Sequence, residues 1–365
     1  MILIASLTSP SLHQKMDQYC DRAIAGISLF TGMMIALFFG FALIMAKPAF
    51  ANESCGGVNL LAGITDQNVL TKIDEETAAQ PNGEGLLWRI TMPNLPDSFL
   101  FGTMHVTDER VLNLPANAQS AFEKSTSLVI ETTDVLDPAK ASAAILKRPD
   151  LMMFTDGSNL EQQIPPEDLE MVKAELSQRG MPLGAVKMMK PWMLAAMLAT
   201  PSCEASRKSK GVEILDISLA TRAKSANKPV GGLETMEEQI SAMASLPMKD
   251  HINGLVETLR MGKMADDVFE TMIALYTQGN TARIMPALSA ALETKVGKTD
   301  LTDLEAQAAF EEKMITNRNT IMANRLPEKL KQGGAFVAIG ALHLPGELGV
   351  VQQLKNAGFT VEAVQ

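Results

Sequence analysis

Apolar runs of strand length flank a long stretch of helical pattern in this chain. Such runs, bounded by Gly, Pro and polar residues, are typical of buried strands. The first three runs are Leu86–Met92, Ser98–His105 and Ser127–Glu131, and the last two are Ala335–Leu344 and Thr360–Val364. One domain with a central sheet and helical insertions accommodates this order more economically than two domains.

The spacing of these runs predicts how they pair. Leu86–Met92 and Ser98–His105 flank a polar loop that contains Pro93, which predicts a hairpin. A helical pattern over Pro115–Lys124 separates Ser98–His105 from Ser127–Glu131, and this β-α-β spacing predicts a parallel pair. We therefore expect an α/β fold with a mostly parallel central sheet.

The middle of the chain, from about residue 137 to residue 330, is predicted to be largely helical. The strand Pro229–Leu233 interrupts this block, and Thr235 with Glu238 three residues later forms a capping box that predicts the next helix start. Helices are expected at 165–179, 186–198 with an interruption at Pro191, 211–226, 251–261, 266–278, 283–293 and 303–330, and a last one at 347–357.

The N-terminal segment is predicted to direct export. Ala23–Ala46 carries no charge, Lys15 and Arg22 precede it, and Ala49-Phe50-Ala51 gives a small-x-small cleavage pattern. The apolar stretch is also long enough to span a bilayer. We expect residues 1–51 to be a cleaved signal or an inner-membrane anchor. Either outcome places the folded domain of residues 52–365 outside the cytoplasm, in the periplasm or secreted.

Charge and cysteine content narrow the function classes. The formal net charge is −10, and no cluster of Lys and Arg with interleaved aromatic residues occurs in the sequence, so we do not expect nucleic-acid binding. Removal of residues 1–51 leaves two cysteines, Cys55 and Cys203. Two cysteines in an oxidising compartment predict a disulfide.

Two histidines occupy similar settings at strand ends. Gly102-Thr103-Met104-His105 and Gly340-Ala341-Leu342-His343 are both Gly-x-x-His motifs that follow apolar runs. Glycine at these positions allows a ligand or a neighbouring backbone to approach closely. Because ligands bind beyond the carboxyl ends of parallel strands, we expect His105 and His343 to meet at one crevice. A single strand-end histidine is usually structural, whereas the repeated motif favours a functional site.

Charged residues near these motifs are further candidates. Glu131 and Glu234 directly follow strands that are expected to be buried. Exposure to solvent therefore does not explain why a charged residue stands at these two positions. Arg318 lies in a long charged helix, where it either belongs to a solvated face or reaches an anionic substrate group. His251 is interpreted as a surface or packing residue.

Two imidazoles and one or two carboxylates form a ligand set for a borderline divalent ion such as Zn, Mn or Co. A remaining glutamate could take a proton from water. The same residues could also work without a metal ion, with histidine as the base and glutamate as its orienting partner. The spacing alone leaves both alternatives open.

The blocks around these residues resemble the TraB/GumN family, whose relatives include the Tiki metalloproteases and, more distantly, erythromycin-esterase-like and ChaN-like proteins. The resemblance covers essentially the whole chain after residue 51 and rests on FGTMHV with His105, VIETT with Glu131, SCEASRKSKGVEILDISLATRA with Cys203 and Asp216, GLETMEEQ with Glu234, NRNTIMA with Arg318 and Asn319, and IGALHLPGELGVVQQLKNAGFTV with His343. It implies an α/β fold and a hydrolase-type site that uses the two histidines and the glutamates. Tiki-like members are described as divalent-metal-dependent proteases that favour Mn or Co. Other members lie near polysaccharide genes or act in peptide-pheromone shutdown, so the family does not fix the substrate.

The leading hypothesis is an exported, metal-dependent, peptidase-like hydrolase acting on a peptide or another small polar substrate. In it, His105, His343 and Glu131 bind a divalent ion, Mn, Co or Zn. Glu234 is the base or a fourth ligand, and Arg318 assists catalysis. The alternatives are a metal-independent esterase-like hydrolase with His105 as base, and a non-enzymatic periplasmic ligand-binding protein.

Overall fold

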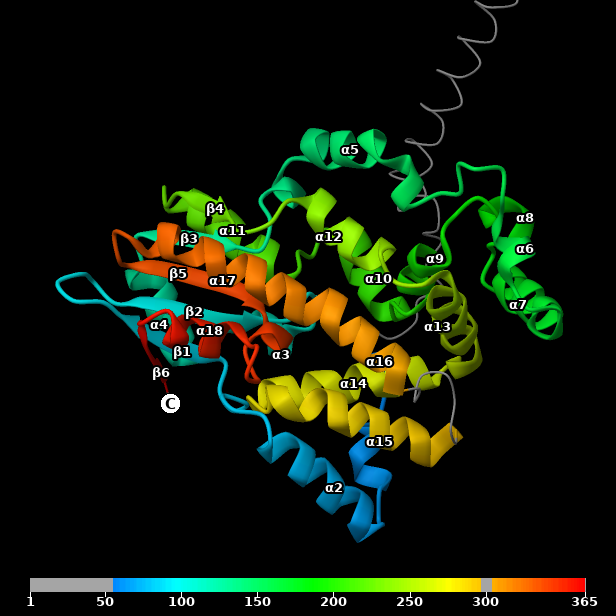
Figure 1. The fold of residues 1–365 in the computed structure, drawn as a ribbon, viewed down its shortest axis with the longest axis horizontal. Helices are drawn as coiled ribbons and strands as arrows, with labels where there is room; N and C mark the ends of the chain where they lie inside the picture. The colour runs from blue at the N-terminus through cyan, green and yellow to red at the C-terminus, as the bar shows by residue number, and fades with distance from the viewer. Residues whose placement is uncertain (1–54, 297–303, 365) are drawn as a thin grey trace, which may run out of the picture. The chain divides into compact units, whose positions relative to one another are not determined.

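A six-stranded sheet forms the centre of the fold in the computed structural model, which describes residues 55–296 and 304–364 (Figure 1). The strand order is β4-β3-β5-β2-β1-β6. The strands are β1 (Leu87–Thr91), β2 (Ser98–Thr103), β3 (Ser127–Ile130), β4 (Val230–Gly232), β5 (Ala335–Gly340) and β6 (Thr360–Ala363).

The sheet is mixed. β4, β3, β5 and β2 pair in parallel, whereas β1 is antiparallel to both β2 and β6. The α/β class and the β1–β2 hairpin are therefore confirmed. The prediction that β2 and β3 form a direct pair is wrong, because β5 lies between them and pairs with both. The physical reason is burial: β5 is buried over Ala335–Ile339 and needs a neighbour on each edge and cover on each face.

Alternation along β5 divides the core between the two faces of the sheet. Phe336 and Ala338 pack with residues of α4 (Ala116–Lys124) and α11 (Leu215–Ser225) on one face. Val337 and Ile339 pack with residues of α17 (Asn317–Leu330) and α18 (Val350–Asn356) on the other face. Both faces are thus covered, and the carboxyl ends of β2, β3, β4 and β5 lie at one edge of the sheet.

The helices occupy the ranges that follow. They are α2 (Gln67–Ala78), α3 (Glu109–Leu112), α4 (Ala116–Lys124), α5 (Pro138–Lys147), α6 (Leu160–Gln163), α7 (Pro166–Gln178), α8 (Leu183–Val186), α9 (Pro191–Leu198), α10 (Ser202–Ser209), α11 (Leu215–Ser225), α12 (Met236–Ala244), α13 (Met248–Met261), α14 (Met264–Thr277), α15 (Ile284–Val296), α16 (Leu304–Phe310), α17 (Asn317–Leu330) and α18 (Val350–Asn356). Short 3₁₀ turns are η1 (Leu60–Gly63), η2 (Asp134–Leu136), η3 (Pro149–Leu151), η4 (Thr281–Arg283) and η7 (Ala341–His343), and a π turn, η6 (Glu311–Thr316), joins α16 to α17.

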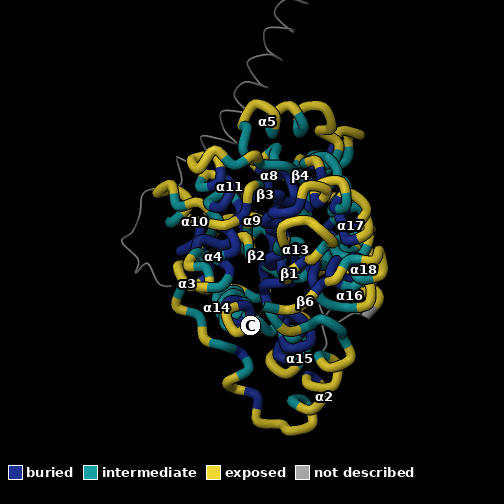
Figure 2. Tube along the Cα trace, turned by 90° about the vertical axis from the view of Figure 1, so that its left-hand side faces the viewer, coloured by how far each residue is buried: buried dark blue, intermediate teal, exposed yellow. Residues whose placement is uncertain are grey.

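The helical pattern between β3 and β5 is present with local differences. The capping box of Thr235 and Glu238 at the start of α12 is confirmed. The helix expected over 186–198 is shorter than predicted: residues 187–190 are not helical, and α9 begins at Pro191, which lies in its first turn. Part of this helical block has its own apolar core, built from α7, α9 and α13. In Figure 2 the central strands are largely buried, whereas much of α5 is exposed.

The predicted export segment, residues 1–51, lies outside the described residues. In the part of the chain that the structure describes, no helix has the length and apolar character needed to cross a bilayer.

Candidate active site

His105 lies two residues beyond β2, and a carboxylate orients its ring. Its Nδ1 is 2.7 Å from Oδ2 of Asp216, which lies on α11 and is buried. The other oxygen of Asp216 accepts a hydrogen bond of 2.7 Å from Oγ1 of Thr103. An ionised carboxylate only accepts hydrogen bonds, so Nδ1 of His105 donates. Nε2 of His105 then faces Oε1 of Glu131 at 3.7 Å.

His343 ends η7, directly after β5, and an amide orients its ring. Its Nδ1 is 2.6 Å from Oδ1 of Asn319, and Nδ2 of Asn319 donates to the carbonyl oxygen of Leu348 at 2.9 Å. Because the amide nitrogen of Asn319 is engaged with a carbonyl, its oxygen faces His343 and Nδ1 of His343 donates. Nε2 of this buried ring lies 3.9 Å from Oε1 of Glu131.

Glu131 directly follows β3 and stands between the two histidines. Its Oε1 accepts a hydrogen bond of 2.7 Å from the backbone N–H of Gly340. Its Oε2 accepts hydrogen bonds from Arg318 at 2.7 Å and from Gln239 at 3.0 Å. The carboxylate is therefore fixed on both sides, with Oε1 directed at the histidine pair.

The two motif glycines are needed for different reasons. A Cβ on Gly340 would lie 3.1 Å from Oε1 of Glu131 and 3.3 Å from Cδ2 of His343, so glycine here leaves space for the site itself. A Cβ on Gly102 would lie 2.7 Å from Cδ1 of Leu344 and 3.0 Å from Cα of Ala341. Gly102 therefore allows the turn after β5 to approach β2.

Glu234 and Arg318 lie behind Glu131. Arg318 on α17 is 8% exposed, so the interpretation of this residue as part of a solvated face is wrong. Its Nη2 donates to Glu131 and Glu234 at 2.7 Å each, and its Nε donates to both oxygens of Glu234 at 3.1 Å. The side chain of Glu234 is fully buried, and Gln239 also donates to it at 3.3 Å. Arg318 thus bridges two buried carboxylates.

The environment changes the pKa values of all three central groups. Burial raises the pKa of Glu131, but His343, His105 and Arg318 outweigh burial and bring this pKa to about 2. Burial lowers the pKa of His105, but Asp216 outweighs it, so that the pKa of His105 rises to about 9. Burial lowers the pKa of His343 to about 4. Near neutral pH the metal-free site therefore holds an ionised Glu131, a neutral His343 and a protonated His105.

The donor atoms around Glu131 are spaced close to the distances that a metal ion requires. Within residues 55–296 and 304–364, no three His, Cys, Asp or Glu side chains are already close enough to enclose an ion. Ligands at about 2.1 Å from a tetrahedral ion are roughly 3.4 Å apart. Oε1 of Glu131 lies 3.7 and 3.9 Å from the two Nε2 atoms, so each of these two donor pairs is within a few tenths of an ångström of that spacing. Both Nδ1 atoms are hydrogen-bonded, as is usual for metal-binding histidines.

Sequence reasoning did not assign roles to the residues that orient the site. Asp216 and Asn319 occur in the blocks that carry the family resemblance, and both are buried polar residues on otherwise amphipathic helices. Gln239 directly follows Glu238, the second residue of the capping box of α12. A buried polar residue in a helix is the signal that could have indicated them, but burial is not visible in a single sequence.

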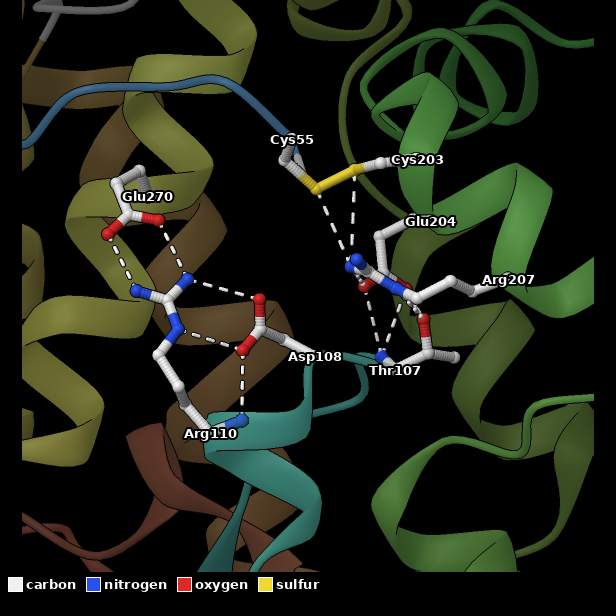
Figure 3. Close-up of a disulfide and its surroundings, with 8 residues drawn as sticks. All are labelled: Cys55, Thr107, Asp108, Arg110, Cys203, Glu204, Arg207 and Glu270. Carbon is white, nitrogen blue, oxygen red and sulfur yellow. Dashed lines mark hydrogen bonds and ion pairs between the residues drawn. A yellow bond between two sulfur atoms is a disulfide. The ribbon is translucent and has the colours of Figure 1, made fainter. Parts of the chain in front are cut away.

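The predicted disulfide between Cys55 and Cys203 is confirmed. Figure 3 shows this bridge beside Glu204 and Arg207 of α10 and the loop that follows His105.

Comparison with known proteins gives a consistent result. The family described as TraB/PrgY/gumN family matches residues 86–363, which run from the residue before β1 to the end of β6. "Metalloprotease TIKI1" of Danio rerio is 29% identical over 323 residues, which cover 78% of this chain and 64% of that protein. "Metalloprotease TIKI2" of Xenopus tropicalis is 28% identical, with 81% and 64% covered. "Uncharacterized protein YbaP" of Escherichia coli (strain K12) is 24% identical, with 73% and 90% covered.

The match thus spans 64% of the length of these two TIKI proteins. No solved structure matches the chain significantly.

Proposed function

Because this chain belongs to the TraB/PrgY/gumN family, we propose that it is an exported metal-dependent hydrolase that cleaves peptides. One observation carries the proposal. Nδ1 of His105 is hydrogen-bonded to Asp216 and Nδ1 of His343 to Asn319, and the Nε2 atoms of both rings face Oε1 of Glu131. The relatives named as metalloproteases support the reaction class.

In this proposal Nε2 of His105, Nε2 of His343 and Oε1 of Glu131 hold the ion. A divalent ion of the Mn, Co or Zn type would supply Lewis acidity toward a carbonyl group or a water molecule. Asp216 and Asn319 keep the two rings in the tautomer that leaves Nε2 free to bind. The His105 side chain is 51% exposed, whereas that of His343 is 5% exposed, so substrate enters from the side of His105.

We assign Arg318 and Glu234 to positioning. Arg318 and Gln239 hold Oε2 of Glu131, which keeps Oε1 directed at the histidines. Glu234 compensates the charge of Arg318. A general base must reach the proton that it removes, and Glu234 is enclosed and paired. We therefore prefer a positioning role for Glu234 to that of base or fourth ligand.

A metal-independent hydrolase is the second candidate, and the His105–Asp216 pair favours it. A carboxylate on Nδ1 is the usual orienting partner of a catalytic histidine base. The elevated pKa of His105, about 9, argues against this role, because the ring is already protonated near neutral pH. Binding of a metal ion to Nε2 would remove that proton, so the metal-dependent function fits the site better.

The experiment is a peptide-cleavage assay on the full-length chain. We expect cleavage that is lost in a chelator, restored by Mn²⁺, Co²⁺ or Zn²⁺, and lost in His343→Ala. His251→Gln, which changes a histidine on α13, is the matched control and should retain activity. Cleavage that persists in the chelator would favour the metal-independent hydrolase. Tight metal binding without cleavage of peptides, esters or glycans would favour a ligand-binding protein.

Export is part of the same proposal. The disulfide fits an oxidising compartment, and residues 23–46 have the composition of a signal or an inner-membrane anchor. The N-terminus of protein recovered from its native compartment distinguishes the two. A start at Asn52 supports cleavage, and an intact segment in the membrane fraction supports an anchor. An intact chain in the cytoplasm would overturn export.

A further inference from the structure

A buried carboxylate holds the loop that follows His105. Thr107, two residues after His105, donates its backbone N–H to both oxygens of Glu204, at 3.1 and 3.0 Å. Its hydroxyl donates to Oε2 of Glu204 at 2.9 Å. Glu204 lies on α10 and is 1% exposed. This carboxylate therefore fixes the main chain immediately beyond His105.

Arg207 connects this contact to the disulfide (Figure 3). Its Nη2 donates to Oε1 of Glu204 at 2.6 Å, and its Nε donates to Oγ1 of Thr107 at 2.9 Å. The same Nη2 lies 3.5 Å from Sγ of Cys55. Cys203 directly precedes Glu204 in α10. The bridge thus lies against the guanidinium group that completes the Glu204 contact.

The other partner in the bridge, Cys55, begins a segment that is attached to α14. The backbone N–H of Val58 donates to Asp267 at 2.8 Å, and that of Leu60 donates to Thr271 at 2.8 Å. The bridge therefore ties α10 to a segment that is held by α14.

The opposite side of the His105 loop is also attached to α14. Arg110 donates two hydrogen bonds of 2.7 Å to Glu270 of α14 and pairs with Asp108 (Figure 3). The loop is thus fixed to α10 through Glu204 and to α14 through Arg110, and the disulfide links these two supports. His343 is held differently, by Asn319 of α17.

We propose that Glu204 is a positioning residue for His105, and that the Cys55–Cys203 bridge keeps Glu204 in place. Loss of the bridge then loosens His105 and leaves His343 unchanged. Reduction by a dithiol converts the bridge into two thiols as the dithiol forms its own cyclic disulfide. The importance of His105 rests on the proposed function, whereas its attachment to Glu204 does not.

The chain contains a matched control for Glu204. Glu257 on α13 is also a buried glutamate, and it also pairs with an arginine three residues later, Arg260, at 2.7 Å. Its neighbours Leu255 and Val256 belong to the core of the helical block. Glu257→Gln therefore makes the same chemical change as Glu204→Gln, away from the loop of His105.

The test is NMR of the histidine rings in the full-length chain, labelled with ¹⁵N-histidine and free of metal. Glu204→Gln should shift the ring signals of His105, including its hydrogen-bonded Nδ1 proton, and leave His343 and His251 in place. Reduction by dithiothreitol should produce the same selective shift, and reduction of Glu204→Gln should add little. Glu257→Gln should leave His105 unchanged. In the same proteins, Mn²⁺ affinity should fall about tenfold in Glu204→Gln and in the reduced chain.

Unshifted His105 signals in both Glu204→Gln and the reduced chain would overturn the inference. Equal shifts of His105 and His343 would also overturn it, because they indicate general loosening. If Glu204→Gln does not fold, Thr107→Val removes the hydroxyl contact instead and should shift His105 alone. A chain that binds no metal ion but shows the selective shift would refute the proposed function and uphold this inference.

Discussion

Replacement of Arg318 by methionine should destabilise the protein strongly. Methionine is similar in length to the arginine stem but carries no charge, so Glu131 and Glu234 would remain buried without their shared cation. Arg318 makes four hydrogen bonds to these two carboxylates, at 2.7 to 3.1 Å. Removal of one partner from a buried ion pair costs about 3–5 kcal/mol, because the remaining charge is uncompensated.

This cost is a large share of the free energy of unfolding, which is typically about 5–15 kcal/mol for a natural domain. A loss of 1 kcal/mol lowers Tm by about 2–4 °C in domains of some 150–250 residues, so we expect Tm to fall by roughly 6–20 °C. Scanning calorimetry of the disulfide-bonded protein measures this shift.

Arg325→Met is the matched control. Arg325 lies two helical turns later on α17 and pairs with Glu238 at 2.7 Å, but its side chain is 44% exposed. An exposed ion pair contributes about 0–1 kcal/mol, so this variant should lose only a few degrees in Tm. Equal losses in the two variants would refute the argument that burial of the two glutamates makes Arg318 essential. Glu234→Gln should partly restore Arg318→Met, since it removes one of the uncompensated charges.

Four further predictions concern the site and the disulfide. Gly340→Ala should weaken Mn²⁺ binding by about 10–100-fold in calorimetric titration, because the new Cβ would lie 3.1 Å from Oε1 of Glu131. Gly254→Ala is the control: its Cβ would meet no described atom within 4 Å, so Mn²⁺ affinity should not change. Apparent metal affinity should rise about tenfold per pH unit towards pH 9 and then level off, because the ion must displace the proton of His105, whose pKa is about 9. A metal affinity that does not change from pH 7 to pH 9 would contradict this. In the metal-free protein, the raised pKa of His105 contributes stability that is fully present below pH 6.5 and lost as the pH rises through about 9. Cys203→Ser should lower the free energy of unfolding by about 5 kcal/mol on the chain-entropy estimate, because the bridge spans 148 residues. A loss below about 1 kcal/mol in denaturant unfolding would contradict this, because it would mean that the unfolded chain is already constrained without the bridge.

The sequence predicted the parts of the fold that local pattern determines. The runs that became β1, β2, β3, β5 and β6 are short and apolar, and the capping box of Thr235 marks the start of α12. The insertion of β5 between β2 and β3 was not predictable in this way, because strand order depends on packing between residues more than 200 positions apart, such as Ser127 and Ala335.

The candidate site was predictable where a motif ends a strand. His105, His343 and Glu131 each follow an apolar run, and the structure brings them together. Their orienting partners were not predictable, since Asp216 reaches His105 across 111 positions and resembles any acidic residue in a helix. The burial of Arg318 was also hidden, because the charged helix around it is typical of an exposed surface.

Metal content tests the central claim most directly, which is that His105, His343 and Glu131 together hold a divalent ion. Elemental analysis of the full-length protein, purified without a polyhistidine tag, should find close to one Mn, Co or Zn ion per chain. His343→Ala should lose most of this metal, and His251→Gln should retain it. A wild-type protein that is metal-free and stays so after dialysis against each ion would contradict the account, as would an undiminished metal content in His343→Ala.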